Sequence, residues 1–293
     1  MSDHLTKGRI YAEKGEKKMN SWSFGVSKYE DAAELFEQSA TCYKLAKEPQ
    51  LAAQSYSKAA SAFTKADSPN EAASALVSAS NVLRKVDGPA AAAMLEQAVG
   101  VLSDGGRFSS AAKHCKVLGE IWEGEGDLGN AMEWYQQSAD FYEGEGSTSA
   151  ADSCLLKVAA FAVTVGDLAR GIRIYEDVAS RSLDNLRKWS CKEYYLRAGL
   201  AHLATDVVAA RQAVARYCDA DASFADTREG VLLAALVDAA EAYDVDAFTA
   251  AVVQFDSVSR LDPWFTSLLL RIKKQIAVEG GVTEAEEDED DLT

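Results

Sequence analysis

The chain has 293 residues, of which 48% are hydrophobic, and its formal net charge at pH 7 is −16. This apolar content is enough for a sizeable core, so a chain that is disordered throughout is excluded. Only four prolines and many alanines favour long helices over an all-β fold, which would need more turn residues and β-branched runs.

The charge is distributed unevenly along the chain. Residues 1–120 hold 15 Lys and Arg against 14 Asp and Glu (+1), and residues 121–293 hold 15 against 32 (−17). The first part can therefore approach an anionic surface, whereas the second repels one and attracts a basic partner. This difference indicates a protein that bridges two partners of different charge.

Residues 1–28 are expected to form an N-terminal helix and a short apolar loop. The first twenty residues are rich in Lys and Glu and lack the apolar region of a signal peptide. Nowhere do about 18 consecutive apolar residues occur, the length that spans a bilayer. We therefore expect a soluble, cytoplasmic protein.

An internal repeat occupies residues 29–185. Alanine pairs recur at intervals of 20 or 39 residues, and related segments fill the longer gaps, so one element recurs about every 20 residues. The segment GDLGNAMEWYQQSA at 126–139 recurs 40 residues later as GDLARGIRIYEDVA at 166–179. Two helices per repeat, separated by glycine-containing turns, predict an all-α, tetratricopeptide-like solenoid of helical hairpins.

The regularity fades after residue 180. Residues 186–278 keep helical patterns, strongest over 231–242 and 247–261, and Pro263 opens another helix that we expect to run to Ile276. These residues are predicted to form a compact C-terminal helical bundle that closes the solenoid. Residues 279–293 contain eight acidic residues and no basic one, which predicts a disordered tail.

No motif for catalysis, metal binding or a cofactor is present. The chain lacks the GxxxxGK[ST] phosphate loop, and His4, His114 and His202 lie far apart in sequence. The five cysteines are odd in number and widely spread, without a CxxC pair, so neither a disulfide framework nor a zinc site is indicated. We expect no enzyme and no nucleic-acid partner.

Three segments carry a resemblance to a known family: GRFSSAAKH at 106–114, YQQSADFYEG at 135–144 with CLLKV at 154–158, and FDSVSRLDPWFTSLLLRIKK at 255–274. Together with the acidic tail ending in Asp-Asp-Leu-Thr, they resemble the soluble NSF attachment protein family, in its alpha type. The similarity runs from about residue 20 to the C-terminus. It implies an adaptor for vesicle transport that lies along the SNARE bundle left after membrane fusion and recruits the ATPase NSF to unwind it.

The resemblance also implies a SNARE-facing surface that is mainly basic. Lys or Arg can hold many different acidic bundles through charge without reading their detailed shape. One lysine of the family is Ser153 in this chain, and Lys157, one turn later, can compensate. The matching positions are Lys47, Arg84, Lys85, Arg107, Lys113, Lys157, Leu186 and Trp189.

The resemblance places an NSF-facing surface in the acidic half. Its residues are Asp206, Asp238 and Glu241, with Asp290, Asp291 and Leu292 in the tail. A neighbouring carboxylate of the family is replaced by Ala242, which weakens or shifts that contact.

The loop at residues 21–26 (SWSFGV) matches a family loop that dips into the bilayer. Trp22 and Phe24 suit the membrane interface, and nearby lysines favour anionic headgroups. The alternative is that both aromatic rings pack on the first helical hairpin. A peripheral membrane association follows only from the first of these.

A second function class is compatible with the repeat. A general tetratricopeptide-like scaffold, such as a co-chaperone that captures acidic peptides, would have the same hairpins. It would not explain the match of the C-terminal segment and tail.

Overall fold

A computed structural model describes residues 2–22, 26–183 and 188–281. The described residues form fourteen α-helices and one short 3-10 helix, without strands, which confirms the all-α prediction. Contacts divide the chain into two compact units, Met1–Cys154 and Leu155–Thr293. The four segments predicted from the sequence, with a boundary near residue 185, stay a prediction.

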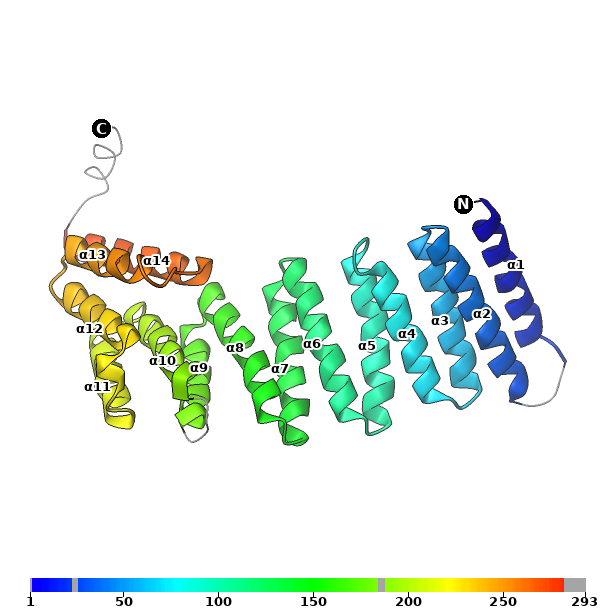
Figure 1. The fold of residues 1–293 in the computed structure, drawn as a ribbon, viewed down its shortest axis with the longest axis horizontal. Helices are drawn as coiled ribbons and strands as arrows, with labels where there is room; N and C mark the ends of the chain where they lie inside the picture. The colour runs from blue at the N-terminus through cyan, green and yellow to red at the C-terminus, as the bar shows by residue number, and fades with distance from the viewer. Residues whose placement is uncertain (1, 23–25, 184–187, 282–293) are drawn as a thin grey trace. The chain divides into compact units, whose positions relative to one another are not determined.

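The first unit is a row of antiparallel helices, each packed on the next (Figure 1). Proline or an aspartate cap begins several of them, as at Pro49, Pro69 and Asp87, because these residues suit the first turn of a helix. The helices are α1 Ser2–Met19, α2 Ser27–Leu45, α3 Pro49–Lys65, α4 Pro69–Leu83, α5 Gly88–Asp104, α6 Phe108–Gly124, α7 Leu128–Gly144 and α8 Thr148–Val165, the last of which continues into the second unit.

Most of the described turns between these helices share a left-handed residue, although the α4–α5 turn does not. Glycine holds this place at Gly106, Gly126 and Gly146, with φ between 70° and 78°. In the α2–α3 turn the residue is Lys47, with φ 63°, and the next amide, that of Glu48, donates to the carbonyl of Tyr43 at 2.9 Å. The same six-to-one hydrogen bond is donated by the amides of Arg107, Asp127 and Ser147, and it satisfies a carbonyl of the preceding helix where the chain reverses.

Small residues form the contact surfaces between the helices. The paired alanines of the repeat are almost fully buried, which confirms that they lie where neighbouring helices approach closely. Buried hydroxyls add hydrogen bonds between helices: Ser39 donates to the carbonyl of Gly8 and Ser138 to that of Ala112, both at 2.8 Å. These alanines include Ala32, Ala33, Ala52, Ala53, Ala72, Ala73, Ala91, Ala92, Ala111, Ala112, Ala131 and Ala151.

One glycine of α6 permits a close approach to α7. A Cβ at Gly119 would lie 2.9 Å from ring carbons of Tyr135, whose buried ring is held by a hydrogen bond from its hydroxyl to Glu123 at 2.8 Å. Because the ring cannot retreat, we predict that Gly119→Ala lowers the free energy of unfolding by about 1–2 kcal/mol in urea titrations. Gly124→Ala, in the same helix with nothing within 4 Å of its Cβ, is the control and should leave stability equal or slightly higher. Equal stabilities of the two variants would contradict the packing argument.

Helix α8 is long and apolar enough to cross a membrane by length and composition, and it is the one described helix that passes this test. Its packing is that of a core helix. Asp152 and Cys154 are buried in it, and the thiol of Cys154 lies 3.4 Å from the hydroxyl of Ser138 on α7.

The second unit packs its helices around an aromatic centre. The rings of Tyr195 and Tyr217 stack with centroids 4.3 Å apart, and Phe224 meets both edge-on. Trp264 donates from its indole nitrogen to the carbonyl of Ala160 at 3.1 Å, which fixes the start of the last helix. The elements are α9 Leu168–Leu183, α10 Lys188–Leu203, α11 Val207–Ala220, the 3-10 helix η1 Phe224–Asp226, α12 Arg228–Glu241, α13 Val245–Asp256 and α14 Pro263–Glu279.

Two helix ends differ from the sequence prediction. Helix α13 ends at Asp256 rather than at residue 261, because the Asp256 carboxylate accepts a hydrogen bond from the Leu261 amide at 2.7 Å and closes a loop. Helix α14 begins at Pro263 as predicted, with Asp262 as its cap, and continues three residues beyond Ile276 to Glu279.

Candidate functional site

The structure distributes the predicted basic residues of the first unit over two edges of the helix row. Lys47 lies in the α2–α3 turn, and Arg84 and Lys85 begin the α4–α5 turn. Because successive helices are antiparallel, these turns share one edge, while Arg107, in the α5–α6 turn, lies at the other. All four residues are exposed.

Two side-chain contacts place α4 and α6 on a common surface. At one end Arg84 pairs with Glu120 at 2.8 Å, and at the other Arg107 donates to the Asn70 side-chain oxygen at 2.6 Å. Lys113 is exposed and lies two helical turns before Glu120, on the same side of α6. The structure therefore brings Arg84, Arg107 and Lys113 onto one pair of helices, which we call the α4–α6 surface.

Sequence reasoning missed one cation of this surface. Lys116 lies three residues after Lys113 and four before Glu120, so it shares their side of α6, and its side chain is partly exposed. The spacing of basic residues along α6 would have revealed it. Glu120, in turn, offsets part of the charge of Arg84.

Several predicted residues cannot be placed on these surfaces. Lys157 is exposed on α8 but belongs to the second unit. Trp189 is the second residue of α10, and its side chain is outside the described part of the chain. Also outside the described residues are Phe24, Leu186, Asp290, Asp291 and Leu292.

The three predicted carboxylates of the second unit lie on two neighbouring helices, and each already has a partner there. Asp206 caps α11 by accepting from the amides of Val208 and Ala209, at 3.3 and 3.0 Å. Arg211 of the same helix forms a two-pronged pair with Glu241 of α12, at 2.9 and 2.7 Å, and also bonds Asp238.

The guanidinium of Arg211 dominates the electrostatics of this acidic cluster. Its hydrogen bonds hold the pKa of the Glu241 carboxyl below its usual range, and the two carboxylates raise the pKa of Arg211. Because all three side chains remain substantially exposed, a basic partner can compete with Arg211 for the carboxylate oxygens.

A carboxylate on another helix, α9, also holds α11 in position. Glu176 of α9 accepts from the Tyr217 hydroxyl at 2.7 Å and from Arg216 at 3.1 Å, and it lies 3.1 Å from the Nε2 atom of His202 on α10. One side chain thus ties three helices together, so the helix that carries Asp206 and Arg211 has a defined place.

The described aromatic residue of the apolar loop does not pack on the first hairpin. Trp22 is 91% exposed, so the packing alternative is contradicted for this residue. The lysines near it are partly engaged: Lys18 pairs with Asp31 at 2.6 Å, and Lys28 donates to the Ser21 carbonyl at 3.2 Å.

The described residues hold no cluster of His, Cys, Asp or Glu that could bind a metal ion.

Burial raises the pKa of the Cys115 thiol to about 12 and that of the Cys191 thiol to about 11, so both thiols stay protonated and unreactive near neutral pH. All five cysteines are free thiols. Burial, with Lys113 nearby, lowers the pKa of His114.

Comparison with known proteins identifies the family. The family model described as soluble NSF attachment protein, SNAP, matches residues 6–277. The alpha-soluble NSF attachment protein of Vitis vinifera is 40% identical over the full length of both chains, and that of Dictyostelium discoideum is 48% identical over 92% of this chain and 96% of its own. A protein of Coprinopsis cinerea named vesicular-fusion protein SEC17 is 42% identical over 92% of this chain and 96% of its own.

Solved structures support the fold. A signal-transduction ATPase with a tetratricopeptide repeat sensor, from Pyrococcus horikoshii, aligns with a TM-score of 0.51 over 86% of this chain and 41% of its own, at 13% identity. This similarity agrees with the predicted repeat architecture of helical hairpins. The family itself is shown by the family model and by the relatives aligned over nearly their whole length: the chain belongs to the soluble NSF attachment protein family.

Proposed function

We propose that this protein is a non-enzymatic adaptor that binds SNARE bundles after membrane fusion, recruits the ATPase NSF and stimulates their disassembly. The observation that carries the proposal is the family match over residues 6–277, together with relatives aligned over nearly their whole length. The α4–α6 surface supplies cations for the acidic outside of a SNARE bundle. The carboxylates around Arg211 supply the contact for a basic surface of NSF.

The proposal is tested by mixing this protein with SNARE bundles, NSF and ATP and following release of the individual SNARE chains. Disassembly that requires this protein and ATP hydrolysis is the expected result. A pull-down from cytosol with and without ATP provides the comparison with a co-chaperone. An ATPase complex that disperses on hydrolysis supports the adaptor, and an ATP-independent complex with acidic peptides would overturn it.

We also propose that the protein associates peripherally with membranes through Trp22 and Phe24. An exposed indole in the segment that follows α1 suits the interface between headgroups and acyl chains. Membrane contact raises the local concentration of the adaptor, so it matters only where a membrane is present.

Replacing Trp22 and Phe24 together by serine is therefore expected to slow disassembly on liposomes by about fivefold or more, an order-of-magnitude expectation from effective concentration. Disassembly of soluble SNARE bundles should stay within about twofold, and the melting temperature should not change, because Trp22 is not packed. Val165→Ser, at a residue that is also an exposed apolar one, is the control. Equal losses with and without liposomes would refute membrane insertion.

A further inference from the structure

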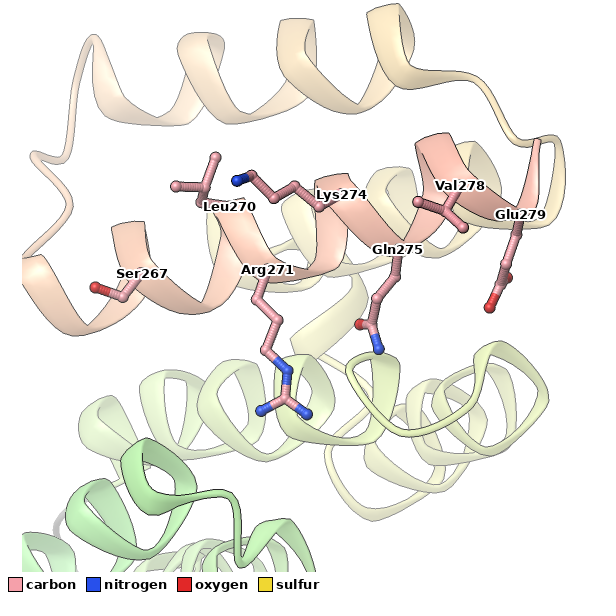
Figure 2. A pocket seen from close by; sticks show the side chains of 7 residues that line it. All are labelled: Ser267, Leu270, Arg271, Lys274, Gln275, Val278 and Glu279. Carbon is pink, nitrogen blue, oxygen red and sulfur yellow. The ribbon is translucent and has the colours of Figure 1, made fainter. Parts of the chain in front are cut away.

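The last helix, α14, exposes a groove that combines apolar and basic side chains. Leu270 is 54% exposed and Val278 is 71% exposed. In Figure 2, Leu270, Lys274 and Val278 lie along one side of the helix, and Arg271 lies along the other. Together with Ser267, Gln275 and Glu279, these four residues line a groove of about 540 Å³.

A smaller apolar cavity shares Leu270 with the groove. It lies between α13 and α14, holds about 180 Å³, and is lined mainly by Phe248, Val252, Leu261 and Leu269 besides Leu270. Such a cavity has room for an aliphatic side chain and little to offer a polar one.

The groove is basic within the acidic part of the chain. Helix α14 carries Arg271, Lys273 and Lys274 against Glu279, whereas residues 121–293 as a whole have a net charge of −17 (15 Lys and Arg, 32 Asp and Glu). Within the described residues, neither Arg271 nor Lys274 has a hydrogen-bond or ion-pair partner. The groove therefore suits an acidic segment that carries an aliphatic residue.

The chain itself has such a segment just beyond this helix. Residues 284–291 contain seven acidic residues, none is basic, and Leu292 follows them directly. We propose that residues 284–292 bind in the α14 groove of the same molecule, with carboxylates on Arg271 and Lys274 and the Leu292 side chain in the cavity beside Leu270.

The length of the segment permits this docking. From Gly281 to Leu292 an extended chain reaches about 36 Å, at roughly 3.3 Å per residue. The distance back along the helix from Val278 to Leu270 is about 12 Å, at 1.5 Å per residue. Gly281 has φ 78°, a left-handed conformation that ends the helix and lets the chain change direction.

One consequence rests on the proposed function. The resemblance places Leu292 among the NSF-facing residues, so a docked segment holds Leu292 away from NSF until NSF displaces it. The docking would then set how readily the adaptor engages the ATPase.

Methyl-labelled NMR of the full chain tests the docking without SNAREs or NSF, so its failure would leave the proposed function standing. We expect nuclear Overhauser contacts between the Leu292 and Leu270 methyl groups. We also expect shifts of the Leu270 and Val278 methyl signals when the chain is shortened after Gly281. Contacts that depend on protein concentration would overturn the proposal in favour of a second copy, and unchanged signals on truncation would refute it outright.

A pair of charge reversals supplies the second measurement. Arg271→Glu with Lys274→Glu should lower the docked population roughly tenfold, as should an increase in ionic strength from about 0.05 to 0.5 M. Both side chains are exposed, so circular dichroism should show an unchanged fold. Lys44→Glu with Lys65→Glu makes the same change of charge elsewhere and should leave the Leu292 signal unaltered. A docked population that survives the reversal at Arg271 and Lys274 would contradict the proposal.

Discussion

Reversing the charge of Arg84, Lys85 and Lys113 to glutamate is expected to weaken binding to SNARE bundles roughly 100-fold, which is about 1 kcal/mol for each reversed contact. Arg84 and Lys113 lie on the α4–α6 surface, and Lys85 follows Arg84 at its edge. The loss of affinity should exceed that for three isolated cations. Without the Arg84 guanidinium, the Glu120 carboxylate is no longer neutralised and also repels an acidic bundle. Titration calorimetry at physiological ionic strength measures the effect.

The fold should survive these three changes. All three side chains are exposed, and an exposed ion pair such as Arg84 with Glu120 contributes about 0–1 kcal/mol to stability. Reversal of Arg9, Lys14 and Lys65, which are equally exposed and lie on α1 and α3, is the matched control. Normal SNARE binding by the triple variant, or an equal loss in the control, would show that the α4–α6 surface is not the site.

Replacing Glu176 by glutamine is expected to lower the free energy of unfolding by about 2 kcal/mol at pH 7. Glutamine keeps the shape but cannot accept from Tyr217, Arg216 and His202 with the strength of a carboxylate. Because 31% of the Glu176 side chain is exposed, water screens part of the loss. Urea titration measures it, and Asp177→Asn, at an exposed neighbour, is the control.

The loss should depend on pH in a defined direction. Burial alone would raise the pKa of the Glu176 carboxyl, but the hydrogen bonds with His202, Tyr217 and Arg216 outweigh burial and lower the pKa to about 2 from an ordinary 4.5. The folded state therefore binds this proton less tightly than the unfolded state, so the stabilisation is complete above pH 4.5 and is lost as the pH falls toward 2. The difference between Glu176→Gln and the parent protein should shrink between pH 4.5 and pH 2. A constant difference across that window would rule out the carboxylate as its source.

The sequence contains most of the information for the helix row but little of that for the site. Paired alanines and glycine turns repeat at a fixed interval, and each is a local requirement of close packing or of chain reversal, so the hairpins could be predicted. The end of α13 could not, because it depends on one hydrogen bond from Leu261 to Asp256. Residue spacing alone also does not show that Arg211 binds Asp238 and Glu241, or that Arg84 meets Glu120, since these pairs lie 27 to 36 residues apart.

The surroundings of Trp22 and the groove on α14 could not be predicted from the sequence either. Trp22 had two possible environments, and the choice required knowing whether the first hairpin leaves room for an indole. The groove on α14 was hidden for a related reason: the LLLRIK pattern at 268–273 predicts an amphipathic helix, but not which side its neighbours leave uncovered.

The left-handed turn at Lys47 has a consequence for anyone who engineers this protein for heat resistance. Equivalent turns use Gly106, Gly126 and Gly146, whereas a lysine in this conformation costs about 1 kcal/mol. A stability screen would therefore select Lys47→Gly, and the selected variant would lose one of the candidate SNARE contacts. Thermal tolerance and affinity compete at this single position, so an optimised adaptor should gain its stability at turns that carry no charge.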